Sequence, residues 1–241
     1  MFDVHTHILP GIDDGSKDPE TSLRMMEMMK EQGVELVVAT PHYYCLDFTP
    51  EQQQQRALDA RGKLEAAWQE KYGSLADMPE LRNGSEIYLA ESLQNVKELK
   101  RLKFTGTDLM LFEMPFNGYR EWIPNLLGLL AGRAKGRPVF AHINRYLGLY
   151  GMKNIALLEQ VPEAIFQFNT ECFDDRACVK FMISLLKQGR TVFFASDCHG
   201  VHRRPPDMGG KMPELEKRLG RKFSADYLND LKRRQADLLG A

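Results

Sequence analysis

The chain alternates short apolar runs with helical segments along its whole length, and this rhythm limits the folds that it can adopt. A first apolar strand (Phe2, Val4) ends in His5-Thr6-His7, and six further runs follow, at residues 34–40, 82–89, 109–114, 139–143, 165–168 and 191–195. Helical patterns separate them at residues 19–33, 50–72, 122–134, 155–161 and 177–188, and two more close the chain at 214–219 and 225–239. Strands that alternate with helices predict a parallel sheet covered on both faces. Because no linker, repeat or low-complexity block interrupts the pattern, we expect one α/β domain over residues 1–241.

Two of these helices carry clear boundary signals. Asp18-Pro19 provides an N-cap and a proline at the first helical position, and Gly33 marks the end of that helix. Thr49-Pro50-Glu51-Gln52 is a capping box that opens a long polar helix, which Gly73 closes after Tyr72.

Polar residues typical of metal sites lie at or just beyond the predicted carboxyl ends of the strands. They are His5, His7, Asp14, His42, Glu86, Glu113, His142, Asp197 and His199. In a (β/α) barrel the loops at this rim converge around one mouth, whereas the outer strands of an open sheet would lie too far apart for all nine to meet. The sequence therefore predicts a distorted, TIM-barrel-like (β/α)7 barrel.

The spacing of these residues predicts a metal centre. Residues i and i+2 of a strand point the same way, so His5 and His7 can present their imidazoles to one point, and Asp197 and His199 repeat this spacing. Imidazole is the most common metal ligand in proteins. Taken alone, His42 is more typical of a satisfied core or loop histidine and Glu86 of a surface charge, but five of the six histidines fall within this set. Together the nine positions favour a site for several metal ions.

Two arginines follow the same strand ends. Arg145 comes three residues after His142, and Arg204 comes five residues after His199. An arginine is most often a surface cation, but a guanidinium at this rim can hold a phosphate with two hydrogen bonds. Metals, carboxylates and two arginines suit a phosphomonoester, because metals polarise phosphoryl oxygens and supply a hydroxide.

The composition excludes several other classes of protein. A net charge of −1 provides no field for binding nucleic acid in bulk. The apolar runs are far below the roughly 20 residues that a membrane helix needs, so we expect no membrane insertion, and no basic-then-apolar leader is evident. The four cysteines (Cys45, Cys172, Cys178, Cys198) follow no disulfide or metal-knuckle spacing. We therefore expect free thiols and a cytoplasmic location.

Several separated motifs in this order resemble the PHP superfamily (polymerase and histidinol phosphatase). They are His5-Thr6-His7, Asp13-Asp14-Gly15, Thr40-Pro41-His42, Glu86, Glu113, His142-Ile143-Asn144-Arg145 and Ser196-Asp197-Cys198-His199. The opening residues 5–16, together with Arg204-Pro205-Pro206, resemble the metal-dependent bacterial protein-tyrosine phosphatases encoded with capsule and exopolysaccharide synthesis.

This resemblance implies three metal ions, usually manganese, iron or zinc, in a distorted (β/α)7 barrel. The first metal would take His5, His7, Glu86 and Asp197, the second Glu86, Glu113 and His142, and the third Asp14, His42 and His199. Arg145 and Arg204 would hold the phosphate. The implied partner is the phosphotyrosine-containing tail of a membrane-associated tyrosine autokinase that regulates polysaccharide synthesis. His202 lies near the last motif, as an additional acid or as a bystander.

Three other functions remain open at the level of the sequence. The first is a small-molecule PHP phosphatase such as histidinol phosphatase, and the second is a nuclease or proofreading PHP module. The third is a binding or scaffold protein that retains a structural metal. The near-neutral charge argues against the nuclease, and the complete set of nine ligand positions argues against the scaffold.

Overall fold

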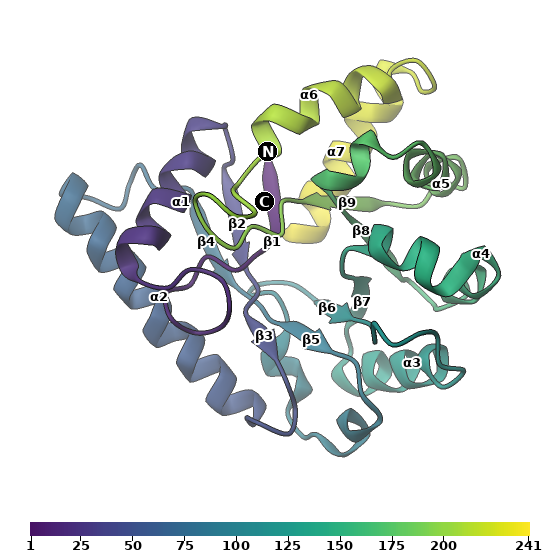
Figure 1. Ribbon diagram of the computed structural model, residues 1–241, viewed down its shortest axis with the longest axis horizontal. Coiled ribbons are helices and arrows are strands. Elements are labelled where there is room, and N and C mark those ends of the chain that lie inside the picture. The colour runs from purple at the N-terminus through teal and green to yellow at the C-terminus, as the bar shows by residue number, and fades with distance from the viewer.

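The computed structural model describes residues 1–241 as parallel strands surrounded by helices (Figure 1). The strands are β1 (Phe2–Thr6), β2 (Leu36–Ala39), β3 (His42–Tyr43), β4 (Glu80–Asn83), β5 (Glu86–Tyr88), β6 (Leu109–Glu113), β7 (Arg137–Phe140), β8 (Ile165–Asn169) and β9 (Val192–Ala195). The α-helices are α1 (Pro19–Glu31), α2 (Pro50–Tyr72), α3 (Ile123–Ala134), α4 (Tyr146–Leu158), α5 (Arg176–Lys187), α6 (Met208–Leu219) and α7 (Ala225–Leu239). Short 3-10 helices are η1 (Glu91–Asn95), η2 (Leu99–Leu102), η3 (Ile143–Arg145) and η4 (Thr170–Asp174).

The strands form two parallel sheets, ordered β1-β2-β4 and β3-β5-β6-β7-β8-β9. The predicted α/β domain of parallel strands is therefore confirmed, but closure into one seven-stranded barrel is not shown. The strand predicted at residues 82–89 is divided between the sheets at Gly84-Ser85, and β3 is a short strand beyond Thr40-Pro41 that the sequence did not predict. Proline cannot donate to a strand ladder, and a Cβ added to Gly84 would lie 2.5 Å from Cδ1 of Phe104, so only glycine allows this close approach.

The two sheets also meet along β1 and β9. A single parallel bridge joins Thr6 to Cys198. The amide of His7 donates to the carbonyl of Cys198 at 3.0 Å, and the amide of Asp197 donates to the carbonyl of His5 at 2.9 Å. This junction joins the first and the last strand. It therefore brings the first predicted metal-binding motif, at His5 and His7, next to the last one, at Asp197 and His199.

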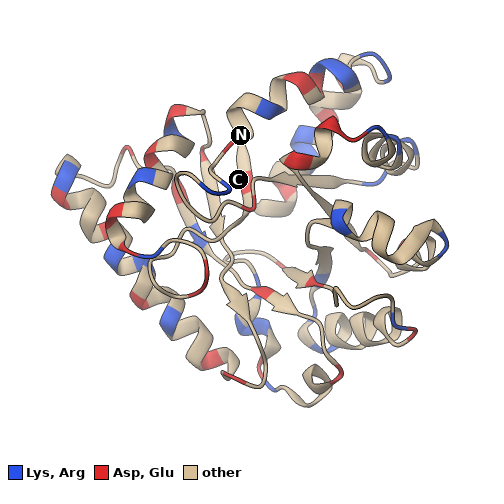
Figure 2. Cartoon of the chain, viewed as in Figure 1, with Lys and Arg blue, Asp and Glu red and all other residues tan.

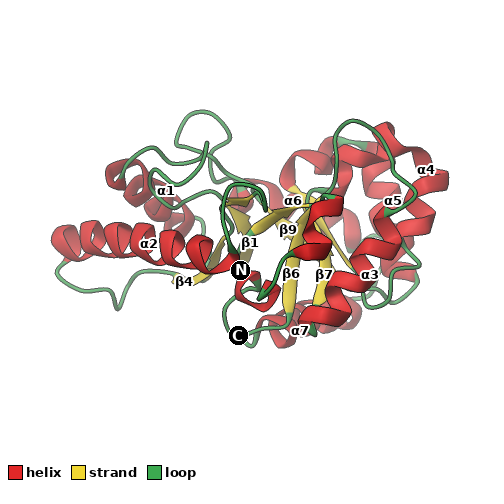
Figure 3. Cartoon of the chain, turned by 90° about the horizontal axis from the view of Figure 1, so that it is seen from below, coloured by secondary structure: helices red, strands yellow, loops and turns green.

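The strands separate two apolar clusters. The inner cluster has 12 buried residues: Val4, Leu36, Val38, Phe104, Leu109, Leu111, Val139, Ala141, Ile165, Phe193, Ala195 and Leu239. It draws on strands of both sheets, and Leu239 closes it from α7. The outer cluster, of 51 buried residues, takes the alternate strand residues such as Met110 and Phe112 and packs them against the helices, which surround the strands in Figure 3. Period-2 alternation of side chains explains why one strand supplies both clusters.

The inner faces of three strands change from apolar to polar toward their carboxyl ends. On β6 the residues Leu109 and Leu111 of the inner cluster are followed at the same spacing by Glu113. In the same way Ile165 is followed by Gln167 and Asn169, and Phe193 and Ala195 are followed by Asp197. This alternation points the polar residues to the same side as the inner cluster and stacks them above it.

The helix boundaries follow the predicted signals closely for α1, α2, α3, α5 and α7. The side chain of Asp18 caps α1, the predicted capping box opens α2, and Gly73 ends α2 in the left-handed conformation with φ 73°. The predictions for α4 and α6 were too short, because both helices start well before the expected residues, at Tyr146 and at Met208. Gly151, with φ 72° and ψ 153°, kinks α4. The kink interrupts the helical spacing of apolar residues, so the pattern predicted only the part of the helix after it.

The prediction of four free thiols was wrong for two cysteines. Cys172 in η4 and Cys178 in the first turn of α5 form a disulfide with their Cα atoms 5.9 Å apart. Cys45 and Cys198 are free, and Cys198 is buried. The turn between η4 and α5 brings two cysteines together that are six residues apart in the sequence. The usual cysteine spacings of disulfide frameworks do not predict such a pair. The cysteines therefore do not support a reducing compartment.

Charged side chains are spread over the outer helices. Figure 2 shows Lys and Arg interspersed with Asp and Glu, as expected for a net charge of −1. None of the helices combines the length and the apolar character that crossing a bilayer requires.

Candidate metal centre

His5 and His7 form the buried floor of the centre at the end of β1. Their Nε2 atoms lie 3.2 Å apart and both side chains are fully buried. Each Nε2 also faces Glu86 Oε2, at 3.3 Å from His5 and 3.2 Å from His7, and Asp197 Oδ1, at 3.5 Å from both. Two imidazoles and two carboxylates therefore converge on one point, as the i, i+2 spacing predicted.

The outer nitrogens of both imidazoles are held by groups that set their orientation. His5 Nδ1 lies 3.1 Å from Gln167 Oε1, and His7 Nδ1 lies 2.7 Å from Asp13 Oδ2. Since both of these partners accept hydrogen bonds, each Nδ1 donates outward and each Nε2 faces the centre, where it can bind a metal ion once it has lost its proton. Metal-binding histidines are usually oriented in this way by a second layer of residues.

Gln167 and Asn169 extend this support across the inner face of β8. Gln167 Oε1 also accepts a hydrogen bond from the amide of His142 at 2.6 Å, and Gln167 Nε2 donates to Asn169 Oδ1 at 2.8 Å. Asn169 Nδ2 in turn donates to Asp197 Oδ2 at 2.8 Å. One buried chain of amides thus positions three of the predicted ligands.

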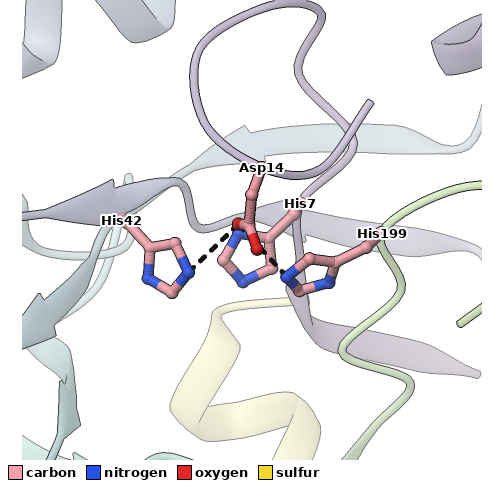
Figure 4. A group of neighbouring side chains, drawn as sticks. All are labelled: His7, Asp14, His42 and His199. Carbon is pink, nitrogen blue, oxygen red and sulfur yellow. Dashed lines mark ion pairs between the residues drawn. The ribbon is translucent and has the colours of Figure 1, made fainter. Parts of the chain in front are cut away.

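A second group lies on the solvent side of His7. Figure 4 shows Asp14 between the imidazoles of His42 and His199, with His7 behind them. Asp14 Oδ1 lies 3.3 Å from His42 Nε2 and 3.5 Å from His199 Nε2. The ligand atoms of these four residues lie within 4.8 Å of one another, a spacing that can hold an ion. This group matches the predicted third site, with His7 added.

Glu86 joins this group to a third one at β5 and β6. Its Oε2 lies 3.0 Å from His42 Nδ1, and its Oε1 lies 2.9 Å from His142 Nε2. Glu113 Oε1 approaches His142 Nε2 at 3.5 Å. His42, Glu86 and Glu113 have ligand atoms close enough to bind one ion. The predicted second site combined these two carboxylates with His142, whereas this cluster contains His42 instead. Glu86 contacts four of the histidines, as a bridging carboxylate would.

Both predicted arginines reach Asp197. Arg145 Nη2 lies 3.0 Å from Asp197 Oδ2, and Arg204 Nη2 pairs with the same oxygen. Arg204 Nη1 is also 3.0 Å from His199 Nε2. Two guanidinium groups therefore stand side by side at the edge of the imidazole and carboxylate cluster. Such a pair can bind the oxygens of one phosphate group.

Backbone strain is concentrated in this centre. Six non-glycine residues have positive φ, and three of them are His142 (φ 28°), Asp197 (φ 52°) and Arg204 (φ 54°). The left-handed region costs free energy for residues with a Cβ, and such strain is typical of functional sites. The surrounding hydrogen bonds impose these conformations and thereby direct the three side chains inward.

The buried carboxylates and imidazoles of the centre shift one another's pKa values. Burial disfavours the ionised forms of Glu86 and Asp197, but the neighbouring histidines outweigh it and hold both pKa values well below the usual range. Burial likewise opposes a charge on His142, yet its hydrogen bonds to Glu113 and Glu86 raise its pKa to about 9. Burial and the charge on His7 lower the pKa of His199 to about 4. The carboxylates therefore stay ionised and attract positive charge, as protons or as metal ions.

The residues fit a group of metal ions on two further observations. The Nδ1 atoms of His42 and His142 are buried without a hydrogen-bond partner, and the approach of His42 to Glu86 lacks hydrogen-bond geometry. The Nε2 atoms of His5 and His7 lie 3.2 Å apart beside the carboxylates of Glu86 and Asp197, a set of donor atoms that a cation between them could share. Nitrogen and carboxylate donors together suit manganese, iron and zinc.

The structure thus brings together all eleven residues that the sequence analysis selected. His202 is exposed, and no hydrogen bond or ion pair joins it to them. Four further residues of the site were not predicted: Asp13, Gln167, Asn169 and Glu171. The signal for two of them was available, because Gln167 and Asn169 continue the inner face of β8 at i, i+2 spacing.

The fold and this centre define the chain as an α/β protein of parallel strands with a candidate metal centre at their carboxyl ends. A family model described as "Capsular polysaccharide synthesis, CpsB/CapC" matches residues 1–236, and the chain belongs to this family.

Several characterised proteins are similar over almost the whole chain. The tyrosine-protein phosphatase YwqE of Bacillus subtilis is 28% identical, over 91% of this chain and 85% of its own length. The tyrosine-protein phosphatase CpsB of Streptococcus pneumoniae is 28% identical, over 95% of this chain and 96% of its own. A solved structure, from work on YwqE and the pneumococcal CpsB as "unique metal-dependent tyrosine phosphatases", superposes with a TM-score of 0.75 at 24% identity, covering 99% of this chain and 94% of that one.

Proposed function

We propose that this protein is a metal-dependent phosphomonoesterase that removes phosphate from phosphotyrosine in proteins. The observation that carries the proposal is the pair Arg145 and Arg204, which meet at Asp197 on the edge of a buried cluster of imidazoles and carboxylates. The names of the family and of its characterised relatives favour a tyrosine-phosphatase activity linked to capsular polysaccharide synthesis over the small-molecule alternative.

The proposal assigns three metal ions to the nine residues predicted from the sequence, with manganese as the expected metal and iron or zinc as alternatives. The first is held by His5, His7, Glu86 and Asp197, the second by Glu86, Glu113 and His142, and the third by Asp14, His42 and His199. One cluster of ligand atoms contains all three residues proposed for the third ion, together with His7, and another contains His5, His7 and Glu86 of the first. The remaining cluster contains Glu86 and Glu113 of the second site, with His42 in place of His142. When bound, the ions supply Lewis-acid activation of water and of the phosphoryl oxygens.

The residues of the chain bind and orient the substrate. Arg145 and Arg204 donate charge-assisted hydrogen bonds to the non-bridging phosphoryl oxygens and neutralise their charge. Asp197 holds both guanidinium groups close together before the substrate arrives. The departing phenolate has a conjugate-acid pKa of about 10, so it leaves with only modest help from an acid, and we assign none.

The proposal extends to the partner and to the architecture. The substrate is the tyrosine-rich tail of a membrane-associated autokinase that regulates polysaccharide synthesis, and the protein acts on it in the cytoplasm, where such a tail is phosphorylated. We also infer that the two sheets act as one distorted seven-position barrel, with the β1–β9 junction as its seam.

The test is phosphate release from a phosphotyrosine peptide and from histidinol phosphate, with manganese and then with excess chelator. We expect chelator-sensitive activity that prefers the peptide, and we expect His42→Ala and Arg145→Ala to abolish it. A preference for histidinol phosphate would instead support the small-molecule phosphatase. Bound metal without hydrolysis of either compound would refute both.

A further inference from the structure

Two large aromatic side chains remain exposed beside the metal centre. Phe116 is 46% exposed and Tyr44 is 40% exposed, although most aromatic rings of the chain are buried. The Phe116 ring stacks on His142 with the centroids 5.8 Å apart and the planes at 26°. The Tyr44 ring lies 5.7 Å from the ring of His42 at 33°. Each exposed aromatic ring therefore contacts a histidine of the centre.

The two histidines are connected through one carboxylate. His142 Nε2 lies 2.9 Å from one oxygen of Glu86, and His42 Nδ1 lies 3.0 Å from the other. Phe116 and Tyr44 consequently flank the row His142–Glu86–His42. A flat group bound over this row would have an aromatic ring on either side.

The backbone at Phe116 is rigidly held, although its ring is exposed. The buried hydroxyls of Tyr146 and Tyr150 donate to the carbonyls of Met114 at 2.6 Å and Pro115 at 2.7 Å, immediately before Phe116. The Phe116 ring also stacks on Tyr146, 5.1 Å away at 22°. The two buried hydrogen bonds hold the backbone just before Phe116, and Tyr146 supports one face of the exposed ring. Such rigidity is what a preformed binding surface requires.

Tyr44 is supported in a similar way. Its ring packs against Tyr88, with the centroids 5.6 Å apart at 45°, and Tyr88 lies at the end of β5, two residues after Glu86. The two aromatic rings thus belong to strands and loops that also carry the proposed metal ligands, so their positions are set by the same framework.

We propose that Phe116 and Tyr44 form a binding subsite for the phenyl ring of phosphotyrosine. This inference rests on the proposed function and deepens it, because it names the side chains that select aryl over alkyl phosphates. An aromatic pair in offset-stacked or edge-to-face contact is stabilised beyond the area that it buries. The side chains of phosphoserine and phosphothreonine carry no ring that could pack against Phe116 or Tyr44.

The experiment measures the affinity of phenylphosphonate and of methylphosphonate for the metal-loaded protein by calorimetry. Both probes carry the same phosphonate group, and neither is hydrolysed, so their ratio isolates the ring. We expect wild type to prefer phenylphosphonate, and Phe116→Ala and Tyr44→Ala each to reduce that preference by about five- to tenfold with little change for methylphosphonate. Leu129→Ala, an equally exposed apolar residue on α3, is the control and should leave the preference unchanged.

Two conservative variants test the ring itself. Tyr44→Phe keeps the ring and should keep the preference, whereas Phe116→Leu keeps apolar bulk without the ring and should lose it even where Phe116→Ala folds poorly. An unchanged ratio in Phe116→Leu and Tyr44→Ala would overturn the subsite and leave the phosphatase assignment intact. Failure of wild type to bind either phosphonate would contradict the phosphate site, and the subsite with it.

Discussion

Asp13 offers a direct test of how the second layer of residues controls the metal centre. The change Asp13→Asn keeps the shape of the side chain and removes its charge. Asp13 accepts hydrogen bonds from His7 Nδ1 at 2.7 Å, from the amide of His42 at 3.1 Å and from the amide of Gly15 at 3.0 Å. The substitution therefore weakens the group that directs the lone pair of His7 toward the centre.

The structure sets the size of the expected effect. Burial alone would raise the pKa of Asp13, but the hydrogen bond from His7 and its charge outweigh burial and lower the pKa to about 2. Relative to the ordinary value of 3.8, this shift corresponds to about 2.4 kcal/mol in favour of the carboxylate. A loss of 10- to 100-fold in metal affinity, which removal of such a partner of a histidine ligand typically causes, spans about 1.4–2.7 kcal/mol. We therefore expect Asp13→Asn to weaken manganese binding by about 10- to 100-fold.

The assay is titration of the chelator-treated protein with manganese, in wild type and in Asp13→Asn. Asp18→Asn is the matched control, since Asp18 caps α1 and asparagine caps a helix equally well. Equal manganese affinity in wild type and Asp13→Asn would refute the orienting role of Asp13.

The stability of the metal-free protein gives a second readout of the same change. The folded pKa of Asp13 is lowered, so its contribution is complete above pH 4 and is lost as the pH falls through about 2. The difference in melting temperature between wild type and Asp13→Asn should therefore be largest near neutral pH and should vanish near pH 2. A difference that does not depend on pH would show that the carboxylate charge is not its source.

Three further predictions follow from other parts of the structure. Glu171 is half exposed, and its Oε1 accepts a hydrogen bond from Arg145 Nε at 3.0 Å. The change Glu171→Gln should weaken this ion pair and leave the guanidinium freer to bind phosphate, which should lower KM for a phosphotyrosine peptide about two- to fivefold with kcat nearly unchanged. A higher KM would contradict this. His142 keeps its proton below pH 9 in the metal-free state, so the apparent metal affinity should fall by up to about tenfold per pH unit below 9. Calorimetry in buffers of different ionisation enthalpy measures the proton that His142 releases when metal binds. Metal binding without proton release would contradict this prediction. Gly84→Ala should lower the free energy of unfolding, measured by denaturant titration, by about 1–3 kcal/mol, because the added Cβ would lie 2.5 Å from the ring of Phe104 in the inner cluster. Gly62→Ala is the control, since no atom lies within 4 Å of its added Cβ, and it should not destabilise the protein.

The local structure of this protein was largely predictable from its sequence. The capping box at Thr49 and the glycine at position 73 mark both ends of α2, because caps satisfy backbone groups within a few residues of themselves. The apolar runs likewise located the strands, since burial on both faces demands continuous apolar sequence. The kink at Gly151 was not predictable, because the left-handed conformation of one glycine depends on packing around it.

The sequence also selected the residues of the centre, and the reason is geometric. Parallel strands bring their carboxyl ends to one edge, so polar residues placed there are neighbours whatever their distance along the chain. His5 and Asp197 are a clear example, at opposite ends of the sequence and 3.5 Å apart in the structure. Their role as metal ligands remains a prediction that metal binding must test.

Only the tertiary structure decided which residues support that centre and how the sheets divide. The hydrogen bonds from His7 to Asp13 and from His5 to Gln167 depend on side-chain directions that spacing alone does not specify. The close approach at Gly84 splits one expected strand between the two sheets, and the short strand β3 after Pro41 was not expected. The turn from η4 into α5 pairs two cysteines that were predicted to be free. Each of these outcomes depends on contacts between segments far apart in the chain or on the exact path of one turn, and a pattern read along the chain contains neither.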